Sequence, residues 1–339
     1  MKSEWTTSDL HKIYRLNNRQ ILTVAESSDR IPKAGRKKRG ASTVRYWPTR
    51  QLPDIGRVFG PYKAKPSRMV IIAVYIKKGG VFKTTFTYTL GRILALSGLR
   101  VLISGLDSQQ NLTNLALNPL YTYESLAQLK VNKGLYELLI SEKKSLQLDD
   151  IIVKTTLPTL DIIPENYNLS KLADHIQTMH ANDQIFKNHI AEPSRELGYD
   201  VLLFDNSPGW NRMAANSIYA SDFIISPAAC EPACYQSLEF YIKEIYTYLS
   251  DVKKKILRHF LIPTNLEKTN KLSTAIQAYY RQNFSDICTA SSIRRTIKGA
   301  EAYVYGQTPI EVEPSSALSD DYQLVIDEVW HEIMKCIEA

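Results

Sequence analysis

Paired cysteines and long apolar runs are both missing from this chain of 339 residues. Cys230, Cys234, Cys288 and Cys336 have neither the spacing of a metal site nor the density of a secreted disulfide scaffold, which predicts free thiols in a reducing compartment. No segment approaches the roughly 18 consecutive apolar residues of a membrane-spanning helix, and the start, Met-Lys-Ser-Glu-Trp, has no apolar signal core. We therefore expect a cytoplasmic protein without a membrane partner.

Acidic residues are scarce in the N-terminal fifth of the chain. Residues 1–68 contain 16 Lys and Arg against 5 Asp and Glu, a net charge of +11, whereas residues 69–339 carry a net charge of −4. This imbalance indicates a small module that binds a polyanion, attached to an ordinary enzyme domain. Solvated basic loops are the alternative. The length allows one domain of roughly 250 residues and a smaller one.

A glycine-rich loop follows the apolar run 69–74 and precedes a helical stretch at 86–96. Residues 77–85 read Lys-Lys-Gly-Gly-Val-Phe-Lys-Thr-Thr. Backbone N–H groups of such a turn and of a helix N-terminus form an anion cradle, in which Lys83 would reach the outer phosphates and Thr84 would hold Mg²⁺. The candidate nucleotide-binding residues are Lys78, Gly79, Gly80, Val81, Phe82, Lys83, Thr84 and Thr85. A strand-to-helix turn without a ligand is the alternative.

Two features set this loop apart from the common phosphate loop. Phe82 stands where the common pattern has its last glycine, and Lys78 directly precedes Gly79. This arrangement resembles the deviant Walker A motif of the ParA, MinD and nitrogenase-iron-protein group of ATPases. The resemblance implies that the cofactors are ATP or ADP with Mg²⁺ and that the protein forms a homodimer. It also implies a catalytic role for Lys78, which would cross to the nucleotide of the partner subunit.

Two strand-end carboxylates follow the loop in the order that this group shows. After the strand candidate 100–103, Asp107 and Gln109 match the second aspartate and the glutamine of the ParA pattern Asp-x-Asp-Pro-Gln, whereas Gly105 replaces the first aspartate. The resemblance implies that Asp107 positions the attacking water; capping of the next helix is the alternative. Asp205 ends the apolar run 200–205 as in a Walker B motif and would hold a water on Mg²⁺.

Two later segments resemble the same family. Residues 261–265 resemble the strand and loop that contact the adenine, so Asn265 is a candidate base contact; an ordinary turn asparagine is equally compatible. Residues 292–302 resemble the segment that carries nonspecific DNA contacts in partition ATPases, with Arg295 and Lys298 at the basic positions. Cations without a directed ligand bind backbone phosphate of any sequence. A solvated charged face is the alternative.

The apolar segments predict an α/β fold with a doubly wound, mostly parallel sheet, because they alternate with helical segments. Nucleotides bind such sheets at the carboxyl ends of the strands. The expected strands are 69–75, 100–104, 160–163, 200–205, 222–226 and 257–263.

The basic N-terminal segment, residues 1–60, is predicted to be a winged helix-turn-helix domain, with a linker at 61–68 and the ATPase domain at 69–339. Short helices are expected from Thr7 and from Asn18, followed by a basic tip at 31–40 and a returning strand. The segment 45–55 resembles MerR-type winged helices. Arg19 and Gln20 are candidate base readers, and the candidate phosphate contacts are Arg36, Lys37, Lys38, Arg39 and Arg45.

Together these features resemble a large ParA-type plasmid or episome partition ATPase, nucleoid-associated in the cytoplasm. The resemblance implies a dimer that binds DNA nonspecifically with ATP, weak hydrolysis stimulated by a ParB-type centromere-binding partner, and an N-terminal domain that binds operator DNA. A nucleotide-switched transcription regulator is the alternative if Gly105 marks a lost hydrolase. A MinD-like membrane regulator is disfavoured by the acidic end at 327–339, and an iron–sulfur reductase by the placement of Cys230 and Cys234.

Overall fold

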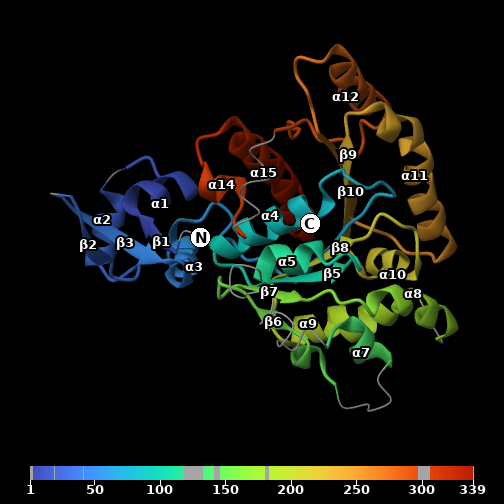
Figure 1. Ribbon diagram of the computed structural model, residues 1–339, viewed down its shortest axis with the longest axis horizontal. Coiled ribbons are helices and arrows are strands. Elements are labelled where there is room, and N and C mark those ends of the chain that lie inside the picture. Colours follow the sequence, from blue (N-terminus) through green and yellow to red (C-terminus); the bar gives the residue numbers. More distant parts are fainter. Residues whose placement is uncertain are drawn as a thin grey trace.

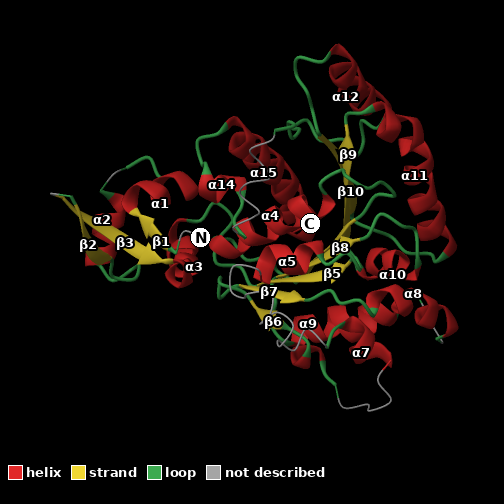
Figure 2. Ribbon diagram, viewed as in Figure 1, coloured by secondary structure: helices red, strands yellow, loops and turns green. Residues whose placement is uncertain are grey.

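The computed structural model describes residues 3–18, 20–40, 42–117, 133–140, 146–179, 183–296 and 306–338. Its larger part is a seven-stranded sheet of order β10-β9-β4-β8-β5-β7-β6 (Figures 1 and 2). All neighbouring strands run parallel except β6 and β7. The strands are β4 (Val70–Val74), β5 (Val101–Leu106), β6 (Val153–Lys154), β7 (Leu160–Ile163), β8 (Val201–Asn206), β9 (Phe223–Ala229) and β10 (Arg258–Thr264).

The expected doubly wound, mostly parallel sheet is confirmed. Alternate residues of the strands point to opposite faces. Ile72 and Leu203 belong to a core with α4 (Lys83–Leu96) and α15 (Ala317–Glu338), whereas Ile71 and Leu202 belong to a core with α8 (Leu169–Thr178) on the other face. The remaining helices of this part are α5 (Asn111–Leu117), α7 (Leu135–Ile140), α9 (Glu192–Glu196), α10 (Arg212–Ala220), α11 (Pro232–Asp251), α12 (Lys271–Asn283) and α14 (Pro309–Val312).

The N-terminal residues form a separate three-stranded antiparallel sheet of order β1-β3-β2, seen at the left of Figure 1. This sheet and three α-helices make up the N-terminal module, whose elements are β1 (Glu4–Thr6), α1 (Thr7–Ile13), α2 (Ile21–Ser27), β2 (Gly35–Arg39), β3 (Ser42–Pro48) and α3 (Leu52–Phe59). Trp5 and Trp47 are fully buried at its centre, and each indole N–H donates a hydrogen bond. Large aromatic side chains therefore fill the centre of this small module, whose buried residues are continuous with the core around α4.

The predicted start of the second helix in this module was wrong. The second helix begins at Ile21 rather than at Asn18, because the Asn18 side chain accepts a hydrogen bond from the N–H of Gln20 at 2.8 Å in a turn before the helix. Arg19 lies outside the described residues.

The module packs against the C-terminal end of α4. The Tyr14 hydroxyl donates to Leu52 O at 2.6 Å and lies 3.2 Å from Leu96 O. A Cβ on Gly56 of α3 would lie 1.8 Å from Leu96 O, so only glycine permits this approach. In the expected linker 61–68, Tyr62 is buried and donates to Asp327 of α15 at 2.6 Å. The segment is thus anchored to the larger part, and the domain boundaries themselves stay a prediction.

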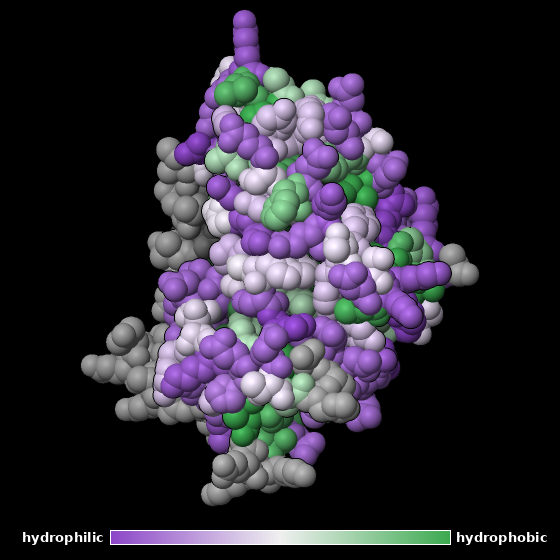
Figure 3. All heavy atoms as spheres, turned by 90° about the vertical axis from the view of Figure 1, so that its right-hand side faces the viewer, coloured by the Kyte–Doolittle hydropathy of each residue, from purple (hydrophilic) through white to green (hydrophobic). Residues whose placement is uncertain are grey.

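Within the described ranges, none of the helices has the combination of length and apolarity needed to cross a bilayer. The face on which α11 lies, turned toward the viewer in Figure 3, is mostly hydrophilic with small, separate hydrophobic patches.

Candidate nucleotide-binding site and DNA-binding surfaces

The glycine-rich loop connects the carboxyl end of β4 to the N-terminus of α4, as predicted. Lys83 is the first residue of α4, only 7% exposed, and its Nζ donates to Lys78 O at 2.5 Å. Burial lowers the pKa of Lys83 to about 8, although Asp205 and Asp107 favour the charged form. Phe82 has a φ of 68°, a left-handed conformation that favours glycine. Phe82 thus takes the backbone conformation suited to the glycine of the common pattern.

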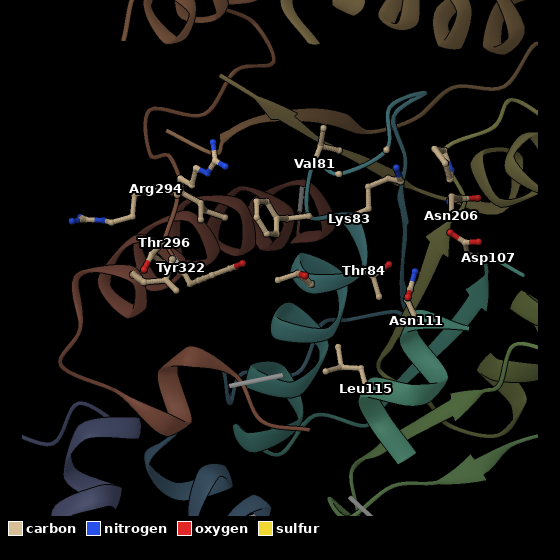
Figure 4. Close-up of a pocket in the computed structure, with 18 residues that line it drawn as sticks. Val81, Lys83, Thr84, Asp107, Asn111, Leu115, Asn206, Arg294, Thr296 and Tyr322 are labelled. Carbon is tan, nitrogen blue, oxygen red and sulfur yellow. The ribbon is translucent and has the colours of Figure 1, made fainter. Parts of the chain in front are cut away.

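A cavity of about 770 Å³ opens beside this loop, large enough for a nucleotide. Figure 4 shows Lys83, Asn206 and Asp107 together at one end and Arg294, Thr296 and Tyr322 at the other. The other lining residues are Gly79, Gly80, Val81, Phe82, Thr84, Thr85, Asn111, Leu115, Pro208, Ile293, Arg295 and Leu318. Phosphate-loop residues from Gly79 to Thr85 therefore all face one cavity.

Asp205 has the properties of a magnesium-site carboxylate. It is fully buried at the carboxyl end of β8, and its Oδ1 accepts from Thr87 Oγ1 at 3.1 Å. Burial raises the pKa of Asp205 to about 6, against hydrogen bonds with Thr84 and Thr87 and the nearby Lys83. Its Oδ2 is buried without a hydrogen-bond partner among the described residues. An unsatisfied carboxylate oxygen beside a threonine fits the oxygen chemistry of Mg²⁺.

Asp107 lies in the loop between β5 and α5, half-buried, and lines the cavity. Its Oδ1 accepts from the Gln109 N–H at 3.0 Å, and its backbone O accepts from the Gln110 N–H at 3.0 Å. The Asp107 carboxylate therefore shapes its own loop at the entrance of α5, yet it also faces the space beside Lys83. Lys83, Thr84, Asp107 and Asp205 are thus brought to one edge of the sheet.

The two adjacent lysines of the loop have different environments. Lys77 Nζ lies 2.9 Å from Glu244 Oε1 and 5.7 Å from the centre of the Phe240 ring. Lys78 is half-exposed, and no carboxylate in the described ranges forms an ion pair with it. Of the two lysines, Lys77 is therefore held within its own chain, and a contact of Lys78 with a partner subunit stays a prediction.

The expected adenine contact is not among the residues that line the cavity. Asn265 follows β10, and its Nδ2 donates to Glu231 Oε1 at 3.1 Å. The far end of the cavity is instead formed by Ile293–Thr296 and by Leu318 and Tyr322 of α15. No feature of the sequence marked Tyr322, because its place in the cavity comes from tertiary packing. A contact between Asn265 and a base stays a prediction.

Of the two basic positions expected to contact DNA near the end of the chain, Lys298 lies outside the described residues. Arg295 lines the cavity, and its Nη1 lies 2.8 Å from Glu267 Oε1 in a mostly exposed pair. An exposed pair of this kind stabilises by roughly 0–1 kcal/mol and opens readily.

The N-terminal basic residues fall into two groups. Arg45 pairs with Glu26, donates to Thr23 Oγ1 at 2.7 Å and lies over the Trp47 ring, so it holds β3 to α2. Lys37 pairs with Glu4. In contrast, Arg36, Lys38 and Arg39 are exposed along β2 and form no ion pair within the described ranges. Gln20 is exposed directly before α2. Contacts of all these residues with DNA stay predictions.

The sheet and the loop define the class of this protein: it has the fold of a P-loop NTPase. A family model described as an AAA domain, AAA_31, matches residues 69–260, more than half of the chain, so the chain belongs to this family. It is 26% identical over 266 residues to the chromosome partitioning protein ParA of Caulobacter vibrioides, covering 78% of this chain and 95% of the relative. It is 25% identical over 259 residues to the sporulation initiation inhibitor protein Soj of Bacillus subtilis, covering 76% and 97%. Within this family, the chain is thus similar over about three quarters of its length to ParA and Soj.

Solved structures share the same fold. A putative plasmid partition protein from Borrelia burgdorferi, bound to AMPPNP, aligns with a TM-score of 0.63 at 19% identity, covering 78% of this chain and all of that one (100%). Cobyrinic acid a,c-diamide synthase from Mycobacterium smegmatis, with a bound ATP analog and magnesium, aligns with a TM-score of 0.57 at 23% identity, covering 70% and 91%.

Proposed function

We propose that this protein is a DNA partition ATPase that couples ATP binding and weak hydrolysis to DNA binding in the nucleoid. The observation that carries the proposal is the meeting of Lys83, Thr84 and Asp107 around one cavity at the carboxyl edge of the sheet, with the Asp205 carboxylate buried close to Lys83 and bonded to Thr87. The ParA and Soj relatives support the same function. Its substrate is ATP, which is converted to ADP and phosphate.

Each residue of the site has a chemical task in this proposal. The Lys83 ammonium and the loop N–H groups hold the outer phosphates, and Thr84 with Asp205 holds Mg²⁺. Mg²⁺ held there would supply positive charge next to the transferring phosphoryl group. Asp107, which faces the same space as Lys83, orients the attacking water.

The proposal of a dimer is based on the different environments of Lys77 and Lys78. Lys77 is held by Glu244, whereas Lys78 has no ion-pair partner within the described ranges. A closed two-fold dimer would place each Lys78 ammonium on the phosphates of the other subunit. ATP therefore binds two chains together, and hydrolysis, stimulated by a ParB-type partner, separates them and releases DNA.

Two surfaces would bind DNA. Arg295 beside the cavity would contact backbone phosphate of any sequence in the ATP-bound dimer. The N-terminal module, a winged helix-turn-helix in this proposal, would bind operator DNA through the exposed start of α2 and through Arg36, Lys38 and Arg39 on the β2–β3 hairpin. Operator binding would repress transcription of its own gene.

The MinD-like alternative requires a free amphipathic helix at the membrane. The C-terminal helix α15 does not provide its apolar face for this purpose, because Val325, Val329 and Ile333 are fully buried against the sheet. A transcription regulator that binds nucleotide but hydrolyses little is the second candidate, favoured by the glycine at position 105 of β5.

Phosphate release separates these candidates. The full chain is incubated with Mg²⁺, ATP, DNA and a ParB-type protein, and compared with Lys83→Ala. The proposal expects release clearly above that of the variant. Release equal to that of Lys83→Ala, with ATP still bound by the unmodified chain, would favour the non-hydrolysing regulator.

Operator binding needs its own test, which is filter binding to promoter and random DNA at moderate salt. Arg36→Ala/Lys38→Ala is expected to weaken binding to promoter DNA. Lys33→Ala is the matched control, because Lys33 is exposed on the same module but paired with Asp29 at 2.6 Å. Equal affinity of the unmodified chain for promoter and random DNA would refute the operator role.

A further inference from the structure

Strand β5 has no side chain at position 105, and a carboxyl group from the loop after β7 fills that space. A Cβ built on Gly105 would lie 2.3 Å from Cγ, 2.6 Å from Cδ and 2.9 Å from Oε1 of Glu165. These distances are shorter than any real carbon contact, so Glu165 occupies the volume that a side chain at position 105 would need. Glu165 itself is fully buried.

The strand register explains how Glu165 reaches this place. Gly105 is paired with Asp205 on β8, and Ser104 is paired with Ile163 on β7. Glu165 follows Ile163 by two residues, at the carboxyl edge of the sheet where the nucleotide cavity lies. Its side chain therefore projects over Gly105 toward the two carboxylates of the site.

The Glu165 carboxyl joins the loop that carries Asp107 to the first turn of α5. Its Oε1 accepts from the Asp107 N–H at 3.4 Å, and its Oε2 accepts from the Thr113 N–H at 3.0 Å and lies 3.3 Å from Thr113 Oγ1. The Glu165 N–H donates in turn to Thr113 Oγ1 at 2.7 Å. Burial and the proximity of Asp205 and Asp107 raise the pKa of Glu165 to about 8.

A buried carboxyl group is costly unless its hydrogen bonds are needed there. We infer that Glu165 is a positioning residue for phosphoryl transfer: it takes the place of a carboxylate at position 105 and holds Asp107 in its orientation toward the cavity. The inference rests on the proposed role of Asp107 in ATP hydrolysis. It also means that the glycine at 105 does not mark a lost hydrolase, because the loop after β7 supplies the carboxyl group.

The test is a reciprocal exchange in the full chain with three variants, Glu165→Ala, Gly105→Asp and the double variant Gly105→Asp/Glu165→Ala. Displacing a reacting group by about 1 Å lowers rates by about 100-fold, so kcat of Glu165→Ala should fall by roughly 10- to 100-fold while the Kd for ATP changes less than about threefold. Gly105→Asp alone should also be slow, because its side chain meets Glu165. The double variant should recover to within about fivefold of the unmodified chain.

The matched control is Asp161→Asn. Asp161 is a buried carboxylate on β7, 3% exposed and paired with Lys154 at 2.8 Å, and it does not line the cavity. Its substitution should leave kcat unchanged within about twofold. If Glu165→Ala keeps the kcat of the unmodified chain, or if the double variant stays as slow as Glu165→Ala, the inference is wrong.

A readout without hydrolysis separates this inference from the proposed function. Amide hydrogen exchange at Asp107 and Thr113, measured without nucleotide, should speed up at least tenfold in Glu165→Ala and return in the double variant. An unmodified chain that binds ATP but releases no phosphate would contradict the proposed function, and exchange would still decide the role of Glu165. If Glu165→Ala does not fold, Glu165→Gln, of equal volume, carries the test. Its amide cannot accept from both N–H groups, so unchanged exchange and kcat in Glu165→Gln would overturn the inference.

Discussion

Lys78→Ala is expected to abolish ATP-dependent dimerisation. A hydrogen bond between charged groups contributes about 1.5–3 kcal/mol, and a two-fold dimer contains two crossing lysines. Their loss therefore weakens the dimer by about 3–6 kcal/mol, or roughly 10²- to 10⁴-fold in its dissociation constant. ATP binding by the separate chain should change little, because Lys83 and the loop N–H groups remain.

Sedimentation velocity of the full chain with Mg²⁺ and a non-hydrolysable ATP analog measures this effect directly. Lys77→Ala is the matched control: it removes the same charge from the neighbouring position, where the ammonium is held by Glu244 at 2.9 Å. Dimerisation of Lys77→Ala should stay within about fivefold of the unmodified chain, since the ammonium of Lys77 is paired within its own chain. If Lys78→Ala dimerises as tightly as Lys77→Ala, Lys78 does not cross between subunits.

Three further predictions concern other parts of the molecule. Burial lowers the pKa of Lys83 to about 8, and bound phosphate would raise this pKa again. ATP binding should therefore take up a proton at pH 8.5 and weaken as the pH rises above 8. Calorimetry in two buffers of different ionisation enthalpy measures the proton uptake, and equal binding heats in the two buffers would contradict it. The Arg92–Glu311 pair is buried, with Nε and Oε2 2.6 Å apart, so Arg92→Met should lower the free energy of unfolding in urea by about 3–5 kcal/mol. Arg92→Met/Glu311→Gln should recover most of it, because a glutamine oxygen can still accept from the Thr308 N–H that Glu311 Oε2 accepts from at 2.9 Å. Removing Arg36 and Lys38 should reduce the slope of log affinity for operator DNA against log salt by about 1.8, and an unchanged slope would exclude both from phosphate contact.

The sheet and the phosphate loop were predictable because their signals lie within short continuous segments. A run of at least three consecutive apolar residues marks each of the strands β4, β5, β8, β9 and β10, and the loop lies between β4 and α4 in the sequence as in the fold. Asp107 and Asp205 were expected at one edge because parallel strands end on the same side. The two-residue strand β6 was missed, since Val153–Lys154 is too short to show alternation.

Features that depend on distant residues could not be predicted. Nothing near Gly105 in the sequence indicates that Glu165 fills its place, because the two meet only through the pairing of β5 with β7. Likewise, Arg45 was interpreted as a phosphate contact from its position after a basic tip, yet its pairing with Glu26 requires the packing of α2 on β3. Tyr322 reaches the cavity only because α15 packs against the sheet.

The central claim is that the nucleotide state of this chain controls its affinity for DNA. Binding of the full chain to a random-sequence duplex, measured with Mg²⁺ and either a non-hydrolysable ATP analog or ADP over a range of salt concentrations, tests it most directly. We expect binding with the ATP analog to be at least tenfold tighter than with ADP and to weaken steeply with salt. The same affinity in both nucleotide states would contradict the claim.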